Sequence, residues 1–382
     1  MIKPLGRVIT QIAFSVLLAG SVAVAQEEIV IGAALPITGP FAGAGLQTYQ
    51  GLQLAEHDIN AAGGINGKKI RFQIEDTQVS NSVAINAFLK LDQQKLPFIF
   101  LSSFTVQNLA TEPEVKKAKV AAMYAGGGVA IAEQNNPYMF RLRAGDTLRA
   151  VATAEAAMGV LKKKKIAIIN IQDQYGNAIA ELLRKNVAAR GGQVVASETH
   201  NIRDTDFAPQ LQNVKNSGAE VLVVFGYIRD HALIIKQRRT LGMTNIPLVS
   251  VTSVNEDSML SLVALEDLQN VIGVADAVLG EANPNGPKSV KFVNDFKARF
   301  KVPPDGFGSV YYDGAMMVAE ALKKVGTDRE KIRAYLASIK GYQGVTGTFS
   351  ASPNGDMLHA LSIVEFIPGK KDVRVIKNVT DK

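Results

Sequence analysis

Two adjacent serines are the first candidates for binding chemistry in this sequence. Ser102 and Ser103 follow a short predicted strand, Phe98 to Leu101, and precede a predicted helix, Thr105 to Lys117. A serine hydroxyl and the free N–H groups of a helix start can together hold a carboxylate. An ordinary helix N-cap needs the same residue type. The residues alone leave both interpretations open.

A run of three glycines is the second candidate. Gly126, Gly127 and Gly128 follow another predicted strand, Val120 to Tyr124. Successive backbone N–H groups in such a run can cradle an anion. A flexible connector explains the same composition equally well.

The residues that catalysis or metal binding would need lack the required spacing. The four histidines are scattered, and none stands at a ligand spacing from another. The chain has no cysteine and no G-x-S-x-G turn. Gly43 to Gly45 lacks the third glycine of a dinucleotide fingerprint, and Gly63 to Lys69 follows a helix instead of preceding one. We therefore expect no catalytic residues, no metal and no cofactor.

The elements that must position these residues alternate between strands and helices. The series starts with the strand Glu28 to Ala34 and the helix Gly45 to Ala61, and restarts after Arg141 with the apolar strand Lys165 to Ile171. This alternation predicts an α/β protein with two doubly wound parallel-sheet lobes. Ligands of such sheets bind beyond the carboxyl ends of the strands. Two facing lobes would therefore enclose a binding cleft.

The first 25 residues predict a secretory signal peptide. Lys3 and Arg7 precede the apolar run Val8 to Gly20, and Ala23 and Ala25 supply the small residues that signal peptidase reads. The apolar run is too short to span a membrane. We expect cleavage before Gln26 and a periplasmic location.

The charge of the chain does not indicate a nucleic-acid partner. The formal net charge of +7 is spread along the sequence. The only dense basic run, Lys162 to Lys165, precedes an apolar strand and has no interleaved aromatic residues.

Over essentially the whole mature chain, the sequence resembles the type I periplasmic binding proteins of the leucine/isoleucine/valine class. The stretches that carry the resemblance, in this order, are IGAALPITGPFAGAG, HDINAAGGINGKKI, DQYGNAIAE and VLVVFGY. The resemblance implies a monomer whose lobes close on a small carboxylate by hinge motion and then dock on an ABC permease.

The resemblance also implies how the chain is divided. Three crossovers would join the lobes, near Ala144 to Asp146, Asp276 to Ala277, and Val345 to Gly347. The implied N-terminal lobe comprises residues 26–145 and 277–346, and the implied C-terminal lobe comprises residues 146–276 and 347–382.

The resemblance assigns roles to the candidate residues. Ser102 or Ser103 would bind the ligand carboxylate, assisted by the glycine run at Gly126 and Gly128. Two tyrosines would form the far wall of the cleft: Tyr175 and Tyr227.

Two departures from the family pattern leave the ligand open. Gly128 stands where amino-acid binders commonly place a threonine, and Thr252 stands where they place the glutamate that pairs the ligand's ammonium. Asp146 could replace that glutamate. Otherwise the ligand would be an aromatic or keto acid without an amino group. The rings that would face such an acid are Phe41, Phe104, Tyr175 and Tyr227.

The function that we expect is non-catalytic capture of a small organic acid for a membrane importer. A periplasmic sensor subunit that presents the ligand to a receptor kinase is the second hypothesis, and an exported enzyme is the third.

Overall fold

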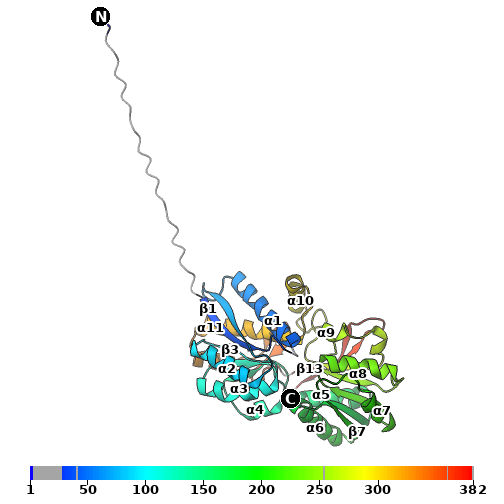
Figure 1. Ribbon diagram of the computed structural model, residues 1–382. Helices are drawn as coiled ribbons and strands as arrows, with labels where there is room; N and C mark the ends of the chain where they lie inside the picture. Colours follow the sequence, from blue (N-terminus) through cyan, green and yellow to red (C-terminus); the bar gives the residue numbers. More distant parts are fainter. Residues whose placement is uncertain (3–27, 40–41, 253, 359, 381–382) are drawn as a thin grey trace.

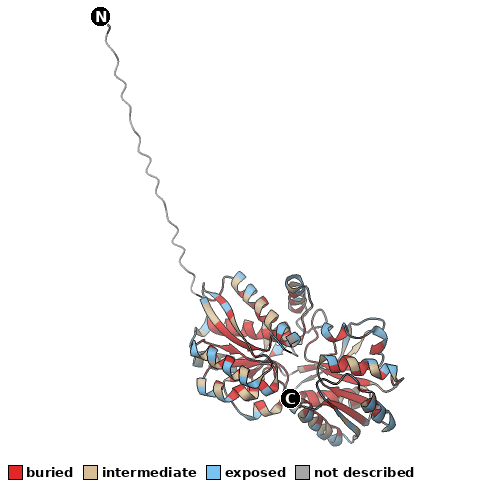
Figure 2. Ribbon diagram, in the orientation of Figure 1, coloured by how far each residue is buried: buried red, intermediate tan, exposed pale blue. Residues whose placement is uncertain are grey.

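The computed structural model describes residues 1–2, 28–39, 42–252, 254–358 and 360–380. Two α/β units lie side by side, with several chain segments passing between them (Figure 1). Figure 2 shows buried residues concentrated along the strands of both units, and exposed residues on the outer helices. Residues 3–25 of the predicted signal peptide, and Phe41, lie outside the described residues.

The first unit, which we call the N-terminal lobe, contains a five-stranded parallel sheet in the order β2-β1-β3-β4-β5. Its strands are β1 (Glu28–Leu35), β2 (Lys69–Asp76), β3 (Ile99–Phe100), β4 (Ala122–Tyr124) and β5 (Met139–Arg141). The helices that connect them are α1 (Ala42–Ala61), α2 (Asn81–Gln93), α3 (Thr105–Ala118) and α4 (Val129–Glu133).

Alternate residues of β1 enter two different cores. Ile31 and Ala33 pack in one buried cluster, whereas Ala34 packs in another. A strand covered by helices on both faces needs small and apolar residues throughout. This requirement explains the continuous apolar run in the sequence of β1.

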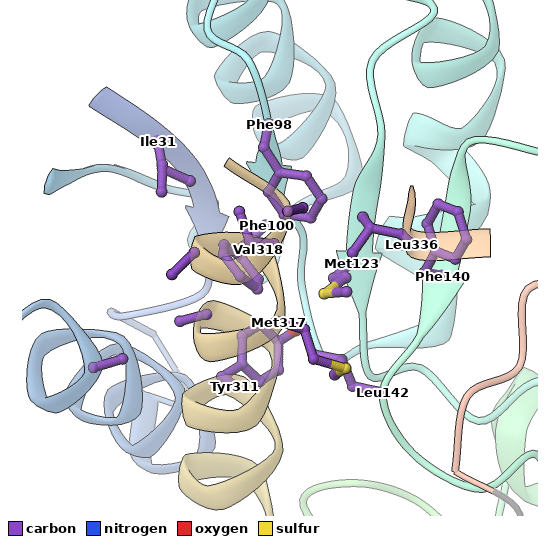
Figure 3. Close-up of a cluster of buried hydrophobic side chains, with 14 of the residues drawn as sticks. Ile31, Phe98, Phe100, Met123, Phe140, Leu142, Tyr311, Met317, Val318 and Leu336 are labelled. Carbon is purple, nitrogen blue, oxygen red and sulfur yellow. The ribbon is translucent and has the colours of Figure 1, made fainter. Parts of the chain in front are cut away.

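Three later helices return to the N-terminal lobe: α10 (Gly286–Phe300), α11 (Gly306–Val325) and α12 (Arg329–Ala337). The α11 helix runs through the core, where Tyr311 and Val318 lie among Phe100 and Leu142 (Figure 3). Asp305 caps the start of α11: its Oδ1 accepts hydrogen bonds from the N–H groups of residues 307 and 308 at 2.9 Å.

The second unit, the C-terminal lobe, contains a seven-stranded sheet in the order β14-β13-β10-β9-β8-β6-β7. Its strands are β6 (Lys165–Ile171), β7 (Gln193–His200), β8 (Val221–Phe225), β9 (Leu248–Thr252), β10 (Val271–Ala275), β13 (Ala360–Phe366) and β14 (Val373–Thr380). Its helices are α5 (Asp146–Ala154), which continues as a π-helix (Glu155–Val160), α6 (Gln174–Ala189), α7 (Ala208–Asn216), α8 (Ile228–Thr240), α9 (Asp257–Leu260) and the 3-10 helix Leu265–Leu268.

The predicted fold class, two α/β lobes built on parallel sheets, is confirmed. One edge of the second sheet adds a feature that the sequence patterns did not indicate. Strand β13 pairs antiparallel with β10, and β14 pairs antiparallel with β13.

The chain crosses between the lobes three times. The first crossing lies between β5 and α5, and the second follows β10. The third lies beyond Leu358, because Phe349, Met357 and Leu358 are buried in the core of the N-terminal lobe. The short strands β11 (Tyr342–Gln343) and β12 (Thr348–Phe349) precede it.

The prediction of a third crossing at Val345 to Gly347 is therefore wrong. Residues 347–358 belong to the N-terminal lobe, where the Met357 N–H donates a hydrogen bond to the Arg141 carbonyl at 3.1 Å. The family resemblance implied a crossing there, but residues 344–347 form the turn between β11 and β12.

A substitution at Phe349 tests the assignment of residues 347–358 to the N-terminal lobe. Phe349→Ala should lower the free energy of unfolding by about 3–5 kcal/mol, because it leaves a large void in the N-terminal core. Urea unfolding measures this loss in the free energy of unfolding, and the m-value should stay unchanged. Phe366→Ala, at a partly buried position in β13, should lose clearly less, and equal losses for the two variants would contradict the placement of residues 347–358.

Candidate functional site

A cavity of about 510 Å³ lies between the two lobes. The N-terminal lobe lines it with residues that follow β3 and β4, including Ser103 and Gly127. The C-terminal lobe lines it with residues that follow β6 and β8, including Asp173, Tyr175 and Tyr227. All of these follow the carboxyl ends of parallel strands, as expected for an open α/β sheet.

The two serines have different surroundings. Ser102 Oγ donates a hydrogen bond to Gln107 Oε1 at 2.5 Å and accepts one from the Phe104 N–H at 3.0 Å. Ser103 lines the cavity and is only 8% exposed, and its Oγ has no hydrogen-bond partner among the described residues. A buried hydroxyl without a partner is unfavourable. Of the pair, Ser103 is the one that can offer its hydroxyl to a guest.

The glycine run is needed mainly for close packing. A Cβ on Gly126 would lie 3.0 Å from the backbone N of Thr105, and one on Gly128 would lie 2.3 Å from Thr105 Cγ2. The Gly128 N–H donates to Thr105 Oγ1 at 3.1 Å. Of the three glycines in this run, only Gly127 lines the cavity. The expected guest contacts of Gly126 and Gly128 therefore have no support in this geometry.

Three aromatic rings connect the lobes across the cavity. The ring centroids of Phe104 and Tyr227 lie 6.1 Å apart, and those of Tyr175 and Tyr227 also lie 6.1 Å apart. The Tyr227 hydroxyl donates to Asp173 Oδ2 at 2.8 Å. Because Phe104 belongs to the N-terminal lobe and both tyrosines to the C-terminal lobe, these rings form an apolar wall that spans the two.

A network of arginine–aspartate pairs lies where the chain crosses between the lobes. The three arginines lie in or beside the first crossing, and the aspartates lie at the first crossing, at the second crossing and shortly before the third. The pairs are Arg141 with Asp356, Arg143 with Asp276, and Arg149 with both Asp146 and Asp276. Breaking such a buried pair typically costs about 3–5 kcal/mol.

Two members of this network also line the cavity with an unpaired atom. Asp146 and Arg149 are each 1% exposed, and Asp146 Oδ2 and Arg149 Nη1 have no hydrogen-bond partner among the described residues. Burial raises the pKa of Asp146, although the charges of Arg149 and Arg141 oppose it. Burial would raise the pKa of Asp276 as well, but Arg143 and Arg149 hold it below its usual range.

A second cavity, of about 440 Å³, adjoins the first. Arg143 lines the first cavity and its partner Asp276 lines the second, so this ion pair lies between them. Two buried carboxylates from opposite lobes, Glu256 and Asp305, line the second cavity. Burial and the neighbouring Asp305 raise the pKa of Glu256 well above its usual value. Burial raises the pKa of Asp305 to about 6.

Several of the predicted site residues line the first cavity, and some residues that line it were not predicted. Ser103, Phe104, Gly127, Asp146, Tyr175 and Tyr227 line the first cavity, whereas Ser102, Gly126 and Gly128 do not. Thr252 ends β9, but its side chain lies outside the description. Arg143 and Arg149 were not singled out. For Arg143, the Arg-Leu-Arg sequence just before a lobe crossing was a usable signal.

The described residues add no sign of a membrane span or a metal centre. None of the helices in the described ranges is long and apolar enough to cross a membrane. Within the same ranges, no group of three or more His, Asp or Glu side chains is arranged to hold a metal ion.

Comparisons with known proteins agree with this architecture. A family model described as periplasmic binding protein matches residues 28–371. A protein of Pseudomonas aeruginosa described as an amino acid binding protein is 27% identical over 341 residues, which cover 87% of this chain and 88% of that protein.

Two solved structures share the fold. The branched-chain amino acid transporter substrate binding protein LivJ from Streptococcus pneumoniae, in complex with isoleucine, has a TM-score of 0.83 at 24% identity and covers 92% of this chain and 100% of its own. A solute binding protein of an ABC transporter from Rhodopseudomonas palustris was solved in complex with 3,4-dihydroxybenzoic acid. It has a TM-score of 0.80 at 22% identity, and the match covers 92% of this chain and 97% of that protein.

The buried Asp305 carboxylate predicts a pH-dependent stability. Its folded pKa of about 6 lies above the ordinary aspartate value of 3.8, so the folded state favours the protonated form. Asp305 therefore destabilises the fold increasingly as the pH rises from about 4 through 6, and fully above that range. Asp305→Asn keeps a helix-capping oxygen and removes the charge. Relative to the unaltered protein, this variant should be more stable at pH 7.5 than at pH 4.5, by on the order of 2 kcal/mol.

Urea unfolding at both pH values measures this difference. Asp328→Asn is the matched control, because Asp328 caps α12 through the Lys331 N–H at 2.9 Å but is exposed. A pH trend of the same size in both variants would contradict the role of burial at Asp305.

Proposed function

This chain belongs to the periplasmic binding protein family, in its leucine/isoleucine/valine class, and from that premise we propose that it captures a small carboxylic acid between its lobes and delivers it to an ABC importer. Members of this family bind solutes and are not enzymes. Its relatives are substrate-binding proteins for amino acids or related ligands.

The observation that carries this proposal is a set of three buried polar atoms on the first cavity. Ser103 Oγ, Arg149 Nη1 and Asp146 Oδ2 have no partner among the described residues, and all three residues line the cavity. Leaving such atoms unpaired typically costs about 1–3 kcal/mol each. The first two atoms are donors suited to carboxylate oxygens, and the third is an acceptor suited to an ammonium.

An α-amino acid with a large apolar side chain is the guest that this arrangement favours. Its carboxylate would meet Ser103 and Arg149, and its ammonium would meet Asp146. Its side chain would lie against the aromatic wall of Phe104, Tyr175 and Tyr227. Charge-assisted hydrogen bonds in a buried cavity are stronger than neutral ones.

An aromatic acid without an amino group is the second candidate guest. The aromatic wall suits a ring, and the protein from Rhodopseudomonas palustris was solved with 3,4-dihydroxybenzoic acid. Asp146 would then have to be protonated to avoid repelling the guest's carboxylate. The burial that raises the pKa of Asp146 makes that protonation easier.

Capture would depend on lobe closure. Ser103 belongs to the N-terminal lobe, while Arg149, Tyr175 and Tyr227 belong to the C-terminal lobe. A guest that contacts both lobes binds the closed arrangement more tightly than an open one and shifts the population toward it. The predicted signal peptide would deliver the protein to the periplasm, where the closed form would dock on the permease as a monomer.

Ser103→Ala should weaken binding of the native acid about 10-fold to 100-fold, because it removes a hydrogen bond to a charged group. The melting temperature of the empty protein should stay unchanged. Isothermal titration of L-leucine, L-phenylalanine, benzoate and 3,4-dihydroxybenzoate measures the affinity.

Ser102→Ala is the control for this experiment. It removes the hydrogen bond to Gln107 and should lower the melting temperature more than it lowers affinity. Equal affinity in Ser103→Ala and the unaltered protein would argue against the assigned role of Ser103. Binding of no carboxylate at all, in the titrations and in native mass spectrometry of the gently purified protein, would overturn the function.

Asp146→Asn separates the two guest classes. For an α-amino acid, the loss of the carboxylate that pairs the ammonium should weaken binding at least 10-fold. For an acid without an amino group, the neutral amide should bind as tightly as the aspartate or more tightly. We expect the first result, and titration of the same four acids decides between them.

A further inference from the structure

One turn at the cavity has an unusual backbone conformation. Gln78 and Val79, between β2 and α2, are both left-handed, with φ angles of 52° and 58°. This region is unfavourable for residues with a side chain, and for a β-branched residue such as valine it is a genuine outlier. Glycine would adopt the same conformation without strain.

Hydrogen bonds from a single buried side chain hold both ends of this turn. Gln107, which is fully buried, donates through Nε2 to Thr77 Oγ1 at 3.0 Å and to the Ser80 carbonyl at 3.3 Å. A second anchor is Asp76, whose Oδ1 accepts from the Gln78 N–H at 3.0 Å. The surroundings therefore determine the strained conformation.

The same glutamine is bonded to the end of β3. Gln107 Oε1 accepts the hydrogen bond from Ser102 Oγ at 2.5 Å, and Ser102 precedes Ser103, which lines the cavity. The turn that carries Val79 and the residue that offers a hydroxyl to the guest are thus connected through one rigid, buried group.

The two strained residues differ in what their side chains contact. Val79 is half-buried and lines the cavity, whereas Gln78 is exposed and does not. A strained conformation that persists with a branched side chain indicates a use for that side chain. In this turn, Val79 is the strained residue whose side chain lines the cavity.

We propose that Val79 is a specificity-determining residue that limits the size of the guest's apolar tail. Gln107 keeps the distance between Val79 and Ser103 constant, so a guest bound by its carboxylate at Ser103 has a fixed space for its tail. An acid with a longer or wider tail would clash with the branched side chain, and such a clash is an effective way to discriminate among similar guests. The inference rests on the proposed function and names the residue that sets its selectivity.

Packing is the competing explanation for Val79. Its Cγ2 lies 3.7 Å from the position that a Cβ on Gly39 would take, so it also contacts the loop after β1. A residue that served only this packing would lower stability when truncated and would leave the choice of guest unchanged.

Three substitutions in the full chain separate strain, packing and selectivity. Val79→Gly relieves strain and enlarges the cavity, Gln78→Gly relieves strain alone, and Val79→Ala enlarges the cavity while keeping the strain. Isothermal titration with L-alanine, L-valine, L-leucine, L-phenylalanine, benzoate and 3,4-dihydroxybenzoate gives each variant's affinity ranking. Thermal unfolding without ligand gives its stability.

Both glycine variants should melt at or above the temperature of the unaltered protein. Both Val79 variants should shift affinity by at least 5-fold toward the bulkier acids, and Gln78→Gly should keep the original ranking. A ranking unchanged by the Val79 substitutions, or a shift of equal size in Gln78→Gly, would refute this inference while leaving solute capture intact. A marked drop in melting temperature for Val79→Gly would assign Val79 to packing. If none of the acids binds the unaltered chain, solute capture and the inference both fail.

Discussion

Arg141, Arg143 and Arg149 come from one short segment, yet they pair with aspartates at the first two crossings between the lobes and shortly before the third. A buried guanidinium without a carboxylate partner is strongly unfavourable, so these pairs hold the crossings together at one place. The ends of β3, β4, β6 and β8 are thereby brought to face one another. The aromatic wall and the cavity depend on this arrangement.

Two residues of this arginine–aspartate network are only partly paired, at atoms that a guest could contact. Asp146 and Arg149 each keep one buried polar atom without a partner among the described residues, and both line the cavity. A guest that pairs with these atoms would stabilise the arrangement in which the crossings lie together. Binding of the guest and the arrangement of the crossings between the lobes would then be coupled through the same two side chains.

Local patterns predicted much of the fold, and residues far apart in the sequence decided the rest. Strand β6 was recognisable because Lys165 to Ile171 is a continuous apolar run, and its bounds agree with the structure. Arg149 and Asp276 stand 127 positions apart, so no local pattern could pair them. Choosing between Ser102 and Ser103 required the surroundings of each hydroxyl, because neighbouring side chains after a strand point in different directions. The left-handed turn at Val79 left no trace in the composition, since its residues are not the glycines that such turns prefer.

The return of α11 to the N-terminal lobe has a consequence for how the protein is made. Tyr311 and Val318 fill a core whose other members, such as Phe100 and Leu142, are synthesised about 200 residues earlier. A nascent chain that ends before Gly306 leaves that core open, so the N-terminal lobe cannot complete its core until α11 has been translated. The C-terminal lobe is also incomplete at that point, because its strands β13 and β14 follow α11 in the chain, so neither lobe can fold fully before the other has largely been translated. The growing polypeptide therefore lacks a complete core in either lobe until α11 and the strands that follow it have been translated.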